Sequence, residues 1–264
     1  MPTLTLTGLH IYPIKSAGGF AAETWPVDDF GLRYDRRWVV VDQEGQALTQ
    51  RELPRLALVR TAIEAGRLRV SAPGRPPLDL PLEPAGAVAM SADVWGDVCA
   101  AYWMGERAAR WFSELLGLPA SLVYMPESTR RPADPAFAPA GVRVSFADGF
   151  PFLLLSEESL EDLNTRLPQA VPMNRFRPNL VIAGGGPYAE DGLATFRIGA
   201  LELEAVKPCD RCVLTTTDQE TGDRGPEPLR TLARFRKVGD KVLFGQNVIH
   251  RTTGRLTVGE ALRA

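Results

Sequence analysis

Residues 201–218 have the sequence LELEAVKPCDRCVLTTTD. Apolar and polar residues alternate over 201–205, and this period of two predicts a strand. Cys209 and Cys212 follow at the end of the strand, and the β-branched residues at 213–217 predict further strand. A cysteine thiolate at such a position could bind a soft metal, attack a substrate or have no chemical role.

The spacing of the two cysteines does not choose among these roles. A redox-active Cys-x-x-Cys pair stands at the start of a helix, so the strand expected over 213–217 argues against a thioredoxin-like function. A structural zinc site needs about four ligands, yet His10 and His250 are the only histidines. The same two residues are the only imidazole bases for a cysteine nucleophile. The third cysteine, Cys99, is interpreted as a small buried hydrophobic residue, and inert core thiols are an equally good interpretation of the pair.

The composition is that of an ordinary globular protein. The 264 residues suffice for one large domain or two small ones, and 45% of them are hydrophobic and 23% charged. No apolar run of about 18 residues and no signal peptide occurs, so we expect no membrane span. An odd number of cysteines does not form a disulfide framework and suits a reducing cytoplasm. The net charge of −2 gives no reason to expect a nucleic-acid partner.

Short apolar runs separated by Gly and Pro predict many strands and few helices. The helical pattern is clear over 106–116, which Gly117 is placed to end, and after Ser156, a good N-cap; a short helix is also expected over 229–235. Strands are expected over 3–11, 39–41, 61–64, 67–70, 88–90, 98–102, 122–124, 141–155 with a break at Asp148-Gly149, 180–182, 196–198, 242–249 and 256–258. This pattern predicts a mostly β (α+β) fold of barrels or sandwiches.

Several polar residues lie beside these strands. Lys15 and Ser16 are on a loop that could hold an anion, although an isolated loop lysine is usually solvated. Arg36 precedes the strand expected at 39–41, where a surface ion pair with Asp35 or Asp42 would explain it without a ligand. Capping of the following helix is likewise a sufficient role for Ser156, although a helix N-terminus also favours anions.

Six motifs in a fixed order make the sequence similar to a known family. They are Tyr-Pro-Ile-Lys-Ser (12–16), Asp-Arg-Arg-Trp (35–38), Leu-Ser-Glu-Glu-Ser-Leu (155–160), Phe-Arg-Pro-Asn (176–179), Tyr-Ala-Glu-Asp (188–191) and Cys-Asp-Arg-Cys (209–212) with the residues up to Thr216. The chain resembles the MOSC family, named after the C-terminal domain of molybdenum cofactor sulfurase. Within it, the closest resemblance is to the branch of the mitochondrial amidoxime-reducing component and the bacterial YcbX-type proteins.

The resemblance implies two domains and a cofactor. Residues 1–122 would form an N-terminal β-barrel domain and 123–264 the MOSC domain, with the proline-rich loop 126–139 as a boundary or a mobile flap. The cofactor would be molybdenum bound to molybdopterin, with Cys212 as the metal ligand, because a soft thiolate suits a sulfur-rich shell. Cys209 would have no direct role. Eight residues would contact the cofactor: Lys15, Ser16, Arg36, Ser156, Arg177, Asn179, Asp210 and Arg211.

The activity implied by the resemblance is the reduction of N-hydroxylated compounds such as amidoximes. The oxygen atom would be removed at a cysteine-ligated molybdenum, with Asp148 as a proton relay. Electrons would come from a separate ferredoxin-like or cytochrome b5-like protein with its reductase, since the sequence shows neither a Cys-rich cluster motif nor a membrane anchor. The alternative is a carrier of molybdenum cofactor or of persulfide sulfur on Cys212. The family term pyridoxal phosphate binding also comes with the resemblance.

Overall fold

The computed structural model describes residues 4–86 and 88–263, which form a mostly β structure with three α-helices. The strands are β1 (Thr5–Ile11), β2 (Phe20–Ala21), β3 (Thr24–Asp28), β4 (Gly31–Leu32), β5 (Trp38–Val41), β6 (Arg60–Glu64), β7 (Arg67–Ser71), β8 (Leu78–Pro81), β9 (Ala89–Val94), β10 (Asp97–Trp103), β11 (Ser121–Tyr124), β12 (Phe152–Ser156), β13 (Leu180–Ala183), β14 (Thr195–Ile198), β15 (Leu201–Asp210), β16 (Lys237–Val238), β17 (Lys241–His250), β18 (Gly254–Thr257) and β19 (Leu262–Arg263). The helices are α1 (Glu106–Leu116), α2 (Glu157–Arg166) and α3 (Leu229–Phe235), with short 3-10 turns η1 (Pro54–Leu58), η2 (Met173–Arg175), η3 (Ala189–Gly192) and η4 (Val213–Thr216).

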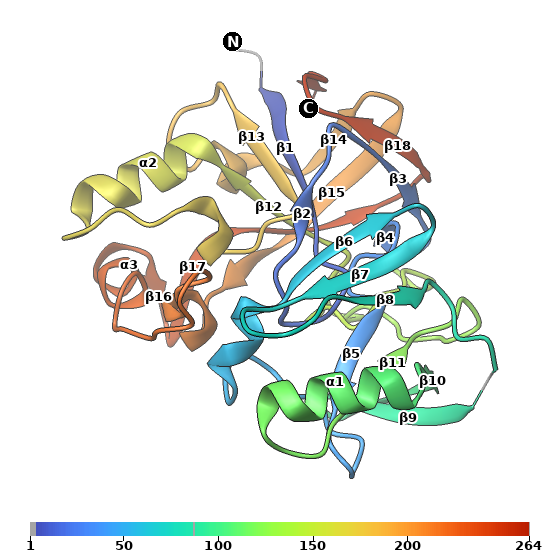
Figure 1. Cartoon of the computed structure of the whole chain (residues 1–264). Coiled ribbons are helices and arrows are strands. Elements are labelled where there is room, and N and C mark those ends of the chain that lie inside the picture. The colour runs from blue at the N-terminus through green and yellow to red at the C-terminus, as the bar shows by residue number, and fades with distance from the viewer. Residues whose placement is uncertain (1–3, 87, 264) are drawn as a thin grey trace.

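The largest sheet has nine strands, in the order β19-β14-β15-β17-β12-β13-β1-β2, with β16 paired to β17 off this path. Neighbouring strands are antiparallel except β12 and β13, which are parallel. Two register shifts interrupt the pairing of β15 with β17, just before the cysteine segment. Because such bulges bend a strand, the end of β15 turns out of the regular ladder there. Helices α2 and α3 lie together beside this sheet (Figure 1).

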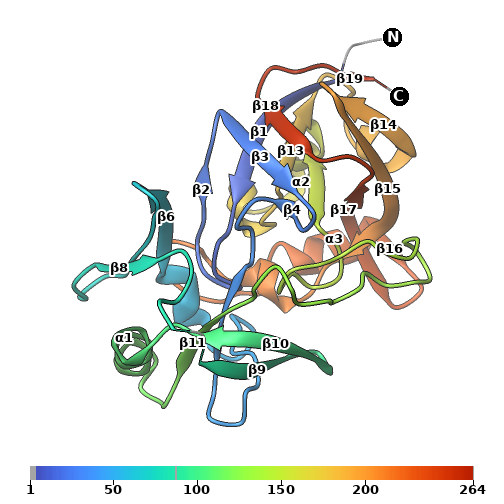
Figure 2. The same ribbon diagram turned by 90° about the vertical axis from the view of Figure 1, so that its right-hand side faces the viewer.

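A second body holds most of the first half of the chain. Its main sheet has the order β5-β11-β10-β9, and a separate three-stranded sheet consists of β6, β7 and β8. Helix α1 packs on both through Ala108, Trp111, Phe112 and Leu115, the apolar face that its sequence predicts. Gly117 ends the helix in the left-handed conformation, as predicted. Figure 2 shows this body below the larger sheet.

The first strands of the chain do not stay with the first half. Strand β1 pairs with β13, and β3 pairs with β18 near the C-terminus. Their apolar side chains, including Leu9 and Val27, belong to the same core as Phe152 and Leu203 of the second half. The segment between β4 and β5 therefore crosses from one body to the other. The domain boundary predicted at residue 122 stays a prediction. Strands from both sides of this residue pair with one another, as β1 does with β13.

Most of the expected elements occur close to their predicted bounds, but two expectations are wrong. Residues 141–151 form no named strand, and the strand expected over 141–155 is restricted to β12. Residues 213–216 form the 3-10 turn η4 instead of continuing the strand. The hydroxyl groups of Thr215 and Thr216 donate to the carbonyls of Cys212 and Val213, and such local bonds compete with a strand ladder.

No helix within residues 4–86 and 88–263 is long and apolar enough to cross a membrane.

Candidate functional site

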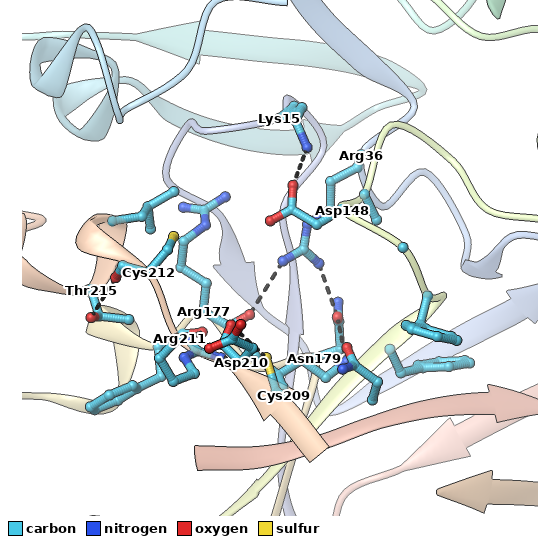
Figure 3. A pocket seen from close by; sticks show the side chains of 18 of the residues that line it. Lys15, Arg36, Asp148, Arg177, Asn179, Cys209, Asp210, Arg211, Cys212 and Thr215 are labelled. Carbon is cyan, nitrogen blue, oxygen red and sulfur yellow. Dashed lines mark hydrogen bonds and ion pairs between the residues drawn. The ribbon is translucent and has the colours of Figure 1, made fainter. Parts of the chain in front are cut away.

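A pocket lies where the two bodies meet, and its walls come from several separate segments of the chain. Loop residues after β1 and before β5 form one wall, and the end of β15 with η4 forms another. The loop before β12 and the segment before β13 complete it. The residues that line the pocket include Lys15, Ser16, Arg36, Asp148, Phe150, Phe176, Arg177, Asn179, Cys209, Asp210, Arg211, Cys212 and Thr215 (Figure 3).

Lys15 is a buried cation on this wall, not a solvated loop residue. Its side chain is only 6% exposed, and its Nζ donates to the Phe146 carbonyl at 2.8 Å and to Asp148 Oδ1 at 2.5 Å. Burial lowers the pKa of Lys15, while Asp148 opposes that shift. The backbone of Ser16, which follows, has a φ of 64°, and the residue is buried. The loop thus presents a desolvated cation to the pocket.

Asp148 lies at the mouth of the pocket with 63% of its side chain exposed. Besides Lys15, it faces Arg51, whose Nη2 is 3.6 Å from Asp148 Oδ2. Partial burial opposes ionisation, but the two cations together lower the pKa of Asp148 below its usual range. Asp148 is therefore ionised at neutral pH.

Arg36 is held by three partners in the pocket wall. Its Nη1 donates to Asp35 Oδ2 at 2.5 Å and to Asn179 Oδ1 at 2.9 Å, and its Nη2 donates to the Arg177 carbonyl at 3.2 Å. Asp35 is 1% exposed, so the expectation of a surface ion pair is wrong: the pair is buried. The side-chain amide of Asn179 donates in turn to the His10 carbonyl. The sequence alone could not show this, because Arg36 and Asn179 are far apart in the chain.

Arg177 differs from Arg36 in having an unsatisfied nitrogen. Its residue is 7% exposed, and its Nη2 is buried with no hydrogen-bond partner among the described residues. Burial, followed by repulsion from Arg36, lowers its pKa to about 10. Its φ of 55° is the left-handed conformation, which is unusual for a residue that is not glycine. Arg211 also has an unsatisfied donor, since its Nε is buried without a hydrogen-bond partner among the described residues.

Cys212 lies between the end of β15 and η4, partly exposed to the pocket. Its carbonyl accepts hydrogen bonds from the backbone and the hydroxyl group of Thr215, which fix the turn. Cys209 lines the same pocket, where its sulfur accepts a hydrogen bond of 3.1 Å from Arg211 Nη1. Burial raises the pKa of Cys209, although Arg211 opposes this. Cys99 is buried in the other body, as predicted.

All but one of the predicted site residues line this pocket; Ser156 does not. Ser156 is fully buried at the start of α2, where its Oγ accepts from the Ser159 amide and lies 2.6 Å from the Ser159 hydroxyl. Its capping role is therefore the one that the structure shows, and the prediction that it borders the pocket is wrong. The reason is that β12 carries it to the far end of the strand from the pocket.

Arg51 is a pocket-rim residue that the sequence reasoning missed. Burial lowers the pKa of Arg51, but Asp148 and the sulfur of Cys212 raise it, and the net direction is upward. It lies in a short turn before η1 that carries no motif, so nothing in its local sequence pointed to the site. The aromatic Phe176 was quoted only as part of a motif, yet it lines the pocket under Arg211.

Two family models match this chain and together cover most of it. The model described as "MOSC N-terminal beta barrel domain" matches residues 3–119, and the model described as "MOSC domain" matches residues 141–263. Mitochondrial amidoxime-reducing component 1 of Mus musculus is 38% identical over 97% of this chain and 81% of its own length.

The chain belongs to the MOSC-domain family.

Two further relatives mark the range of this family. Mitochondrial amidoxime-reducing component 1 of Homo sapiens is 37% identical over 97% of this chain and 81% of its own length. Molybdenum cofactor sulfurase of Oryza sativa subsp. japonica is 36% identical over 91% of this chain, but this chain spans only 32% of the sulfurase. The MOSC chain described here therefore covers most of the first kind of relative and about a third of the second.

The chemistry of the pocket side chains fits a phosphorylated metallopterin. A phosphate is a multivalent anion, and the buried Arg177 Nη2 and Arg211 Nε are donors without a described partner. Lys15 adds a further cation, which is itself buried. Cys212 supplies a soft ligand, and the described residues contain no group of three or more His, Cys, Asp or Glu that could hold a metal by itself. This donor set suits a metal that arrives with sulfur ligands of its own.

Proposed function

We propose that this MOSC protein is an oxidoreductase that binds molybdenum–molybdopterin in this pocket and reduces N-hydroxylated small molecules. The observation that carries the proposal is the meeting in one pocket of the Cys212 sulfur with Arg177 and Arg211, each of which has a buried nitrogen without a described partner. The names of the amidoxime-reducing relatives, at about 37% identity, support the reaction class. Substrates would be amidoximes and similar N-hydroxylated bases, and electrons would come from a separate ferredoxin-like or cytochrome b5-like partner.

Some of the protein's residues would bind the cofactor, and others would keep its ligand in position. Arg177 and Arg211 would donate their free N–H groups to the phosphate and the pterin, while Lys15 would neutralise charge. Cys212 would be the protein ligand of the metal, held in place by the two hydrogen bonds that its carbonyl receives from Thr215. When bound, the cofactor would supply two-electron oxygen-atom transfer, which no side chain can perform. Ser16, Asn179 and Asp210 would complete the binding wall.

Asp148 is a weak candidate for the proton relay that the sequence reasoning assigned to it. Two cations lower its pKa, so at neutral pH it has no proton to donate and accepts one poorly. We propose instead that Asp148 positions Lys15 and Arg51 at the mouth. Its role as a relay stays a prediction with a direct test, given in the Discussion.

The proposal is tested by comparing Cys212→Ser with Cys209→Ser, both made in a cell that synthesises the cofactor. The measurements are molybdenum per chain and reduction of an amidoxime with an artificial electron donor. We expect Cys212→Ser to lose metal and activity, and Cys209→Ser to keep both within about tenfold. Equal metal content in the wild type and Cys212→Ser would overturn the assignment of the ligand.

The second candidate function is a carrier of the cofactor or of persulfide sulfur. The specific observation in its favour is the partial exposure of Cys212, beside Val213, which is 39% exposed. A sulfur donor could reach such a cysteine. Mass spectrometry of the purified protein decides between the two: a persulfide on Cys212 in a metal-free, inactive protein supports the carrier.

A further inference from the structure

The tip of the β9–β10 hairpin carries an exposed tryptophan beside the pocket mouth. Val94 and Asp97 pair across the hairpin, so Trp95 and Gly96 are its two turn residues. Both have positive φ, 61° and 91°, which is the turn in which Asn and Gly are preferred. A bulky aromatic residue in this conformation is a genuine outlier, and half of its surface is exposed to solvent. Neither local backbone preference nor core packing explains a tryptophan here.

Trp95 is nevertheless fixed by contacts with pocket residues. Its indole Nε1 donates to Asp148 Oδ1 at 3.2 Å, the carboxylate oxygen that also accepts from Lys15. The guanidinium of Arg51 lies 4.0 Å from the centre of the Trp95 ring, and Lys15 Nζ lies 5.5 Å from it. The ring therefore lies at the rim with a defined orientation, while half of its surface remains uncovered.

Among the described residues, six large hydrophobic side chains are exposed, and three of them are tied to the pocket. Trp95 donates a hydrogen bond to Asp148, and Val213 follows Cys212 in the chain. Phe137 packs edge-to-face with the pocket residue Phe150, with ring centres 6.4 Å apart. An exposed indole beside a cationic, sulfur-containing pocket suits a small molecule with a polar head and a flat apolar body.

We infer that Trp95, oriented by Arg51 and Asp148, binds the planar ring of the substrate and makes the protein selective for aromatic over aliphatic N-hydroxylated compounds. This inference rests on the proposed function, because it takes the N-hydroxyl group to point toward Cys212. The ring of the substrate stacks on the uncovered part of the indole. An aromatic pair of this kind is worth about a three- to tenfold gain in affinity beyond the area it buries.

The test is equilibrium binding to the cofactor-loaded full chain without an electron donor, so that no turnover occurs. The probes are benzamidoxime and acetamidoxime, which share the N-hydroxylated head and differ in the ring. We expect the wild type to bind benzamidoxime about tenfold more tightly than acetamidoxime. Trp95→Leu should lose most of this preference, whereas Trp95→Phe should keep it because the ring remains. Val98→Ala is the matched control, since Val98 is an exposed hydrophobic residue on the same hairpin.

The outcomes separate this inference from its rivals. If Trp95→Leu weakens the binding of both amidoximes equally, Trp95 only holds Asp148 in position and the inference is overturned. No preference in the wild type overturns it as well. If the protein shows the preference but reduces neither compound with an artificial donor, the binding site stands and the proposed reductase activity fails.

Discussion

Arg36 and Arg177 lie against the same tyrosine ring but differ in how their charges are satisfied. Their guanidinium carbons are 4.4 and 4.3 Å from the centre of the Tyr12 ring. Arg36 has a buried carboxylate and two oxygen acceptors, whereas Arg177 Nη2 has no described partner. Removing one partner of a buried ion pair is costly, whereas a buried donor without a partner already carries a desolvation cost that a ligand oxygen would relieve. We therefore propose that the Arg36 side of the pocket acts mainly as scaffold and that the Arg177 side is the main binding face.

The largest effect expected from this contrast is the loss of stability on Arg36→Met. The substitution leaves Asp35, which is 1% exposed, as a buried carboxylate without its counter-charge. Removing one partner of a buried pair costs about 3–5 kcal/mol in the free energy of unfolding. Urea unfolding of the cofactor-free protein measures it. The control is Arg197→Met, whose ion pair with Glu202 is exposed and should be worth less than about 1 kcal/mol. Equal losses in the two variants would mean that the Arg36 pair is no scaffold.

Arg177→Met should change the free energy of unfolding of the cofactor-free protein in the opposite direction, toward greater stability. The pKa of Arg177 is lowered to about 10, so the folded state disfavours its charge. The unfolded state binds the proton more tightly, so the charged Arg177 destabilises the folded state. This destabilisation is fully present at neutral pH and decreases only above about pH 10. We expect the variant to be about 1–3 kcal/mol more stable than the wild type, and to retain less molybdenum. A destabilised variant with full metal content would remove the distinction between the two sides.

The contrast also shows what the sequence could and could not reveal. Local signals were enough for α1, which Gly117 ends as expected, and for the two strands expected over 61–64 and 67–70. They failed at residues 213–216, where the threonine hydroxyls bond to nearby carbonyls and replace the expected strand. The pairing of β1 with β13 depends on contacts about 170 residues apart, which no local pattern encodes.

The site was predictable as a set of motifs but not as a network. Lys15, Arg36, Arg177 and Cys212 belong to motifs, and the structure brings them to one pocket. Sequence adjacency pointed to Asp35 as a partner of Arg36, but not to its burial or to Asn179, which is 143 residues away. Arg51 and Trp95 lie outside any motif, so only three-dimensional proximity to Asp148 reveals them.

Ser156→Ala should affect the scaffold without affecting the binding face. The serine hydroxyl caps α2 through the Ser159 amide at 3.1 Å and lies away from the pocket. Loss of a side-chain N-cap costs about 1–2 kcal/mol in the free energy of unfolding. The molybdenum content should stay that of the wild type. Thr165→Ala in the same helix is the control and should cost less than about 0.5 kcal/mol. Loss of metal in Ser156→Ala, with stability unchanged, would return this serine to the cofactor site.

The smallest effect on stability is expected for Asp148→Asn, which also tests whether this residue moves protons. Because 63% of the side chain is exposed, solvent screens its ion pairs, and the substitution should cost less than about 1 kcal/mol.

The lowered pKa of Asp148 means that its stabilising contribution is present above the ordinary value of about 4 and is lost only as the pH falls below it. We therefore expect the pH profile of kcat to have the same shape in the wild type and in Asp148→Asn between about pH 5 and 9. If a limb of the wild-type profile disappears in the variant, Asp148 titrates in that range and the relay is real. The exposed carboxylate of Asp148 would then belong to the binding face. In that case solvent accessibility, and not the presence of hydrogen-bond partners, would distinguish the binding face from the scaffold.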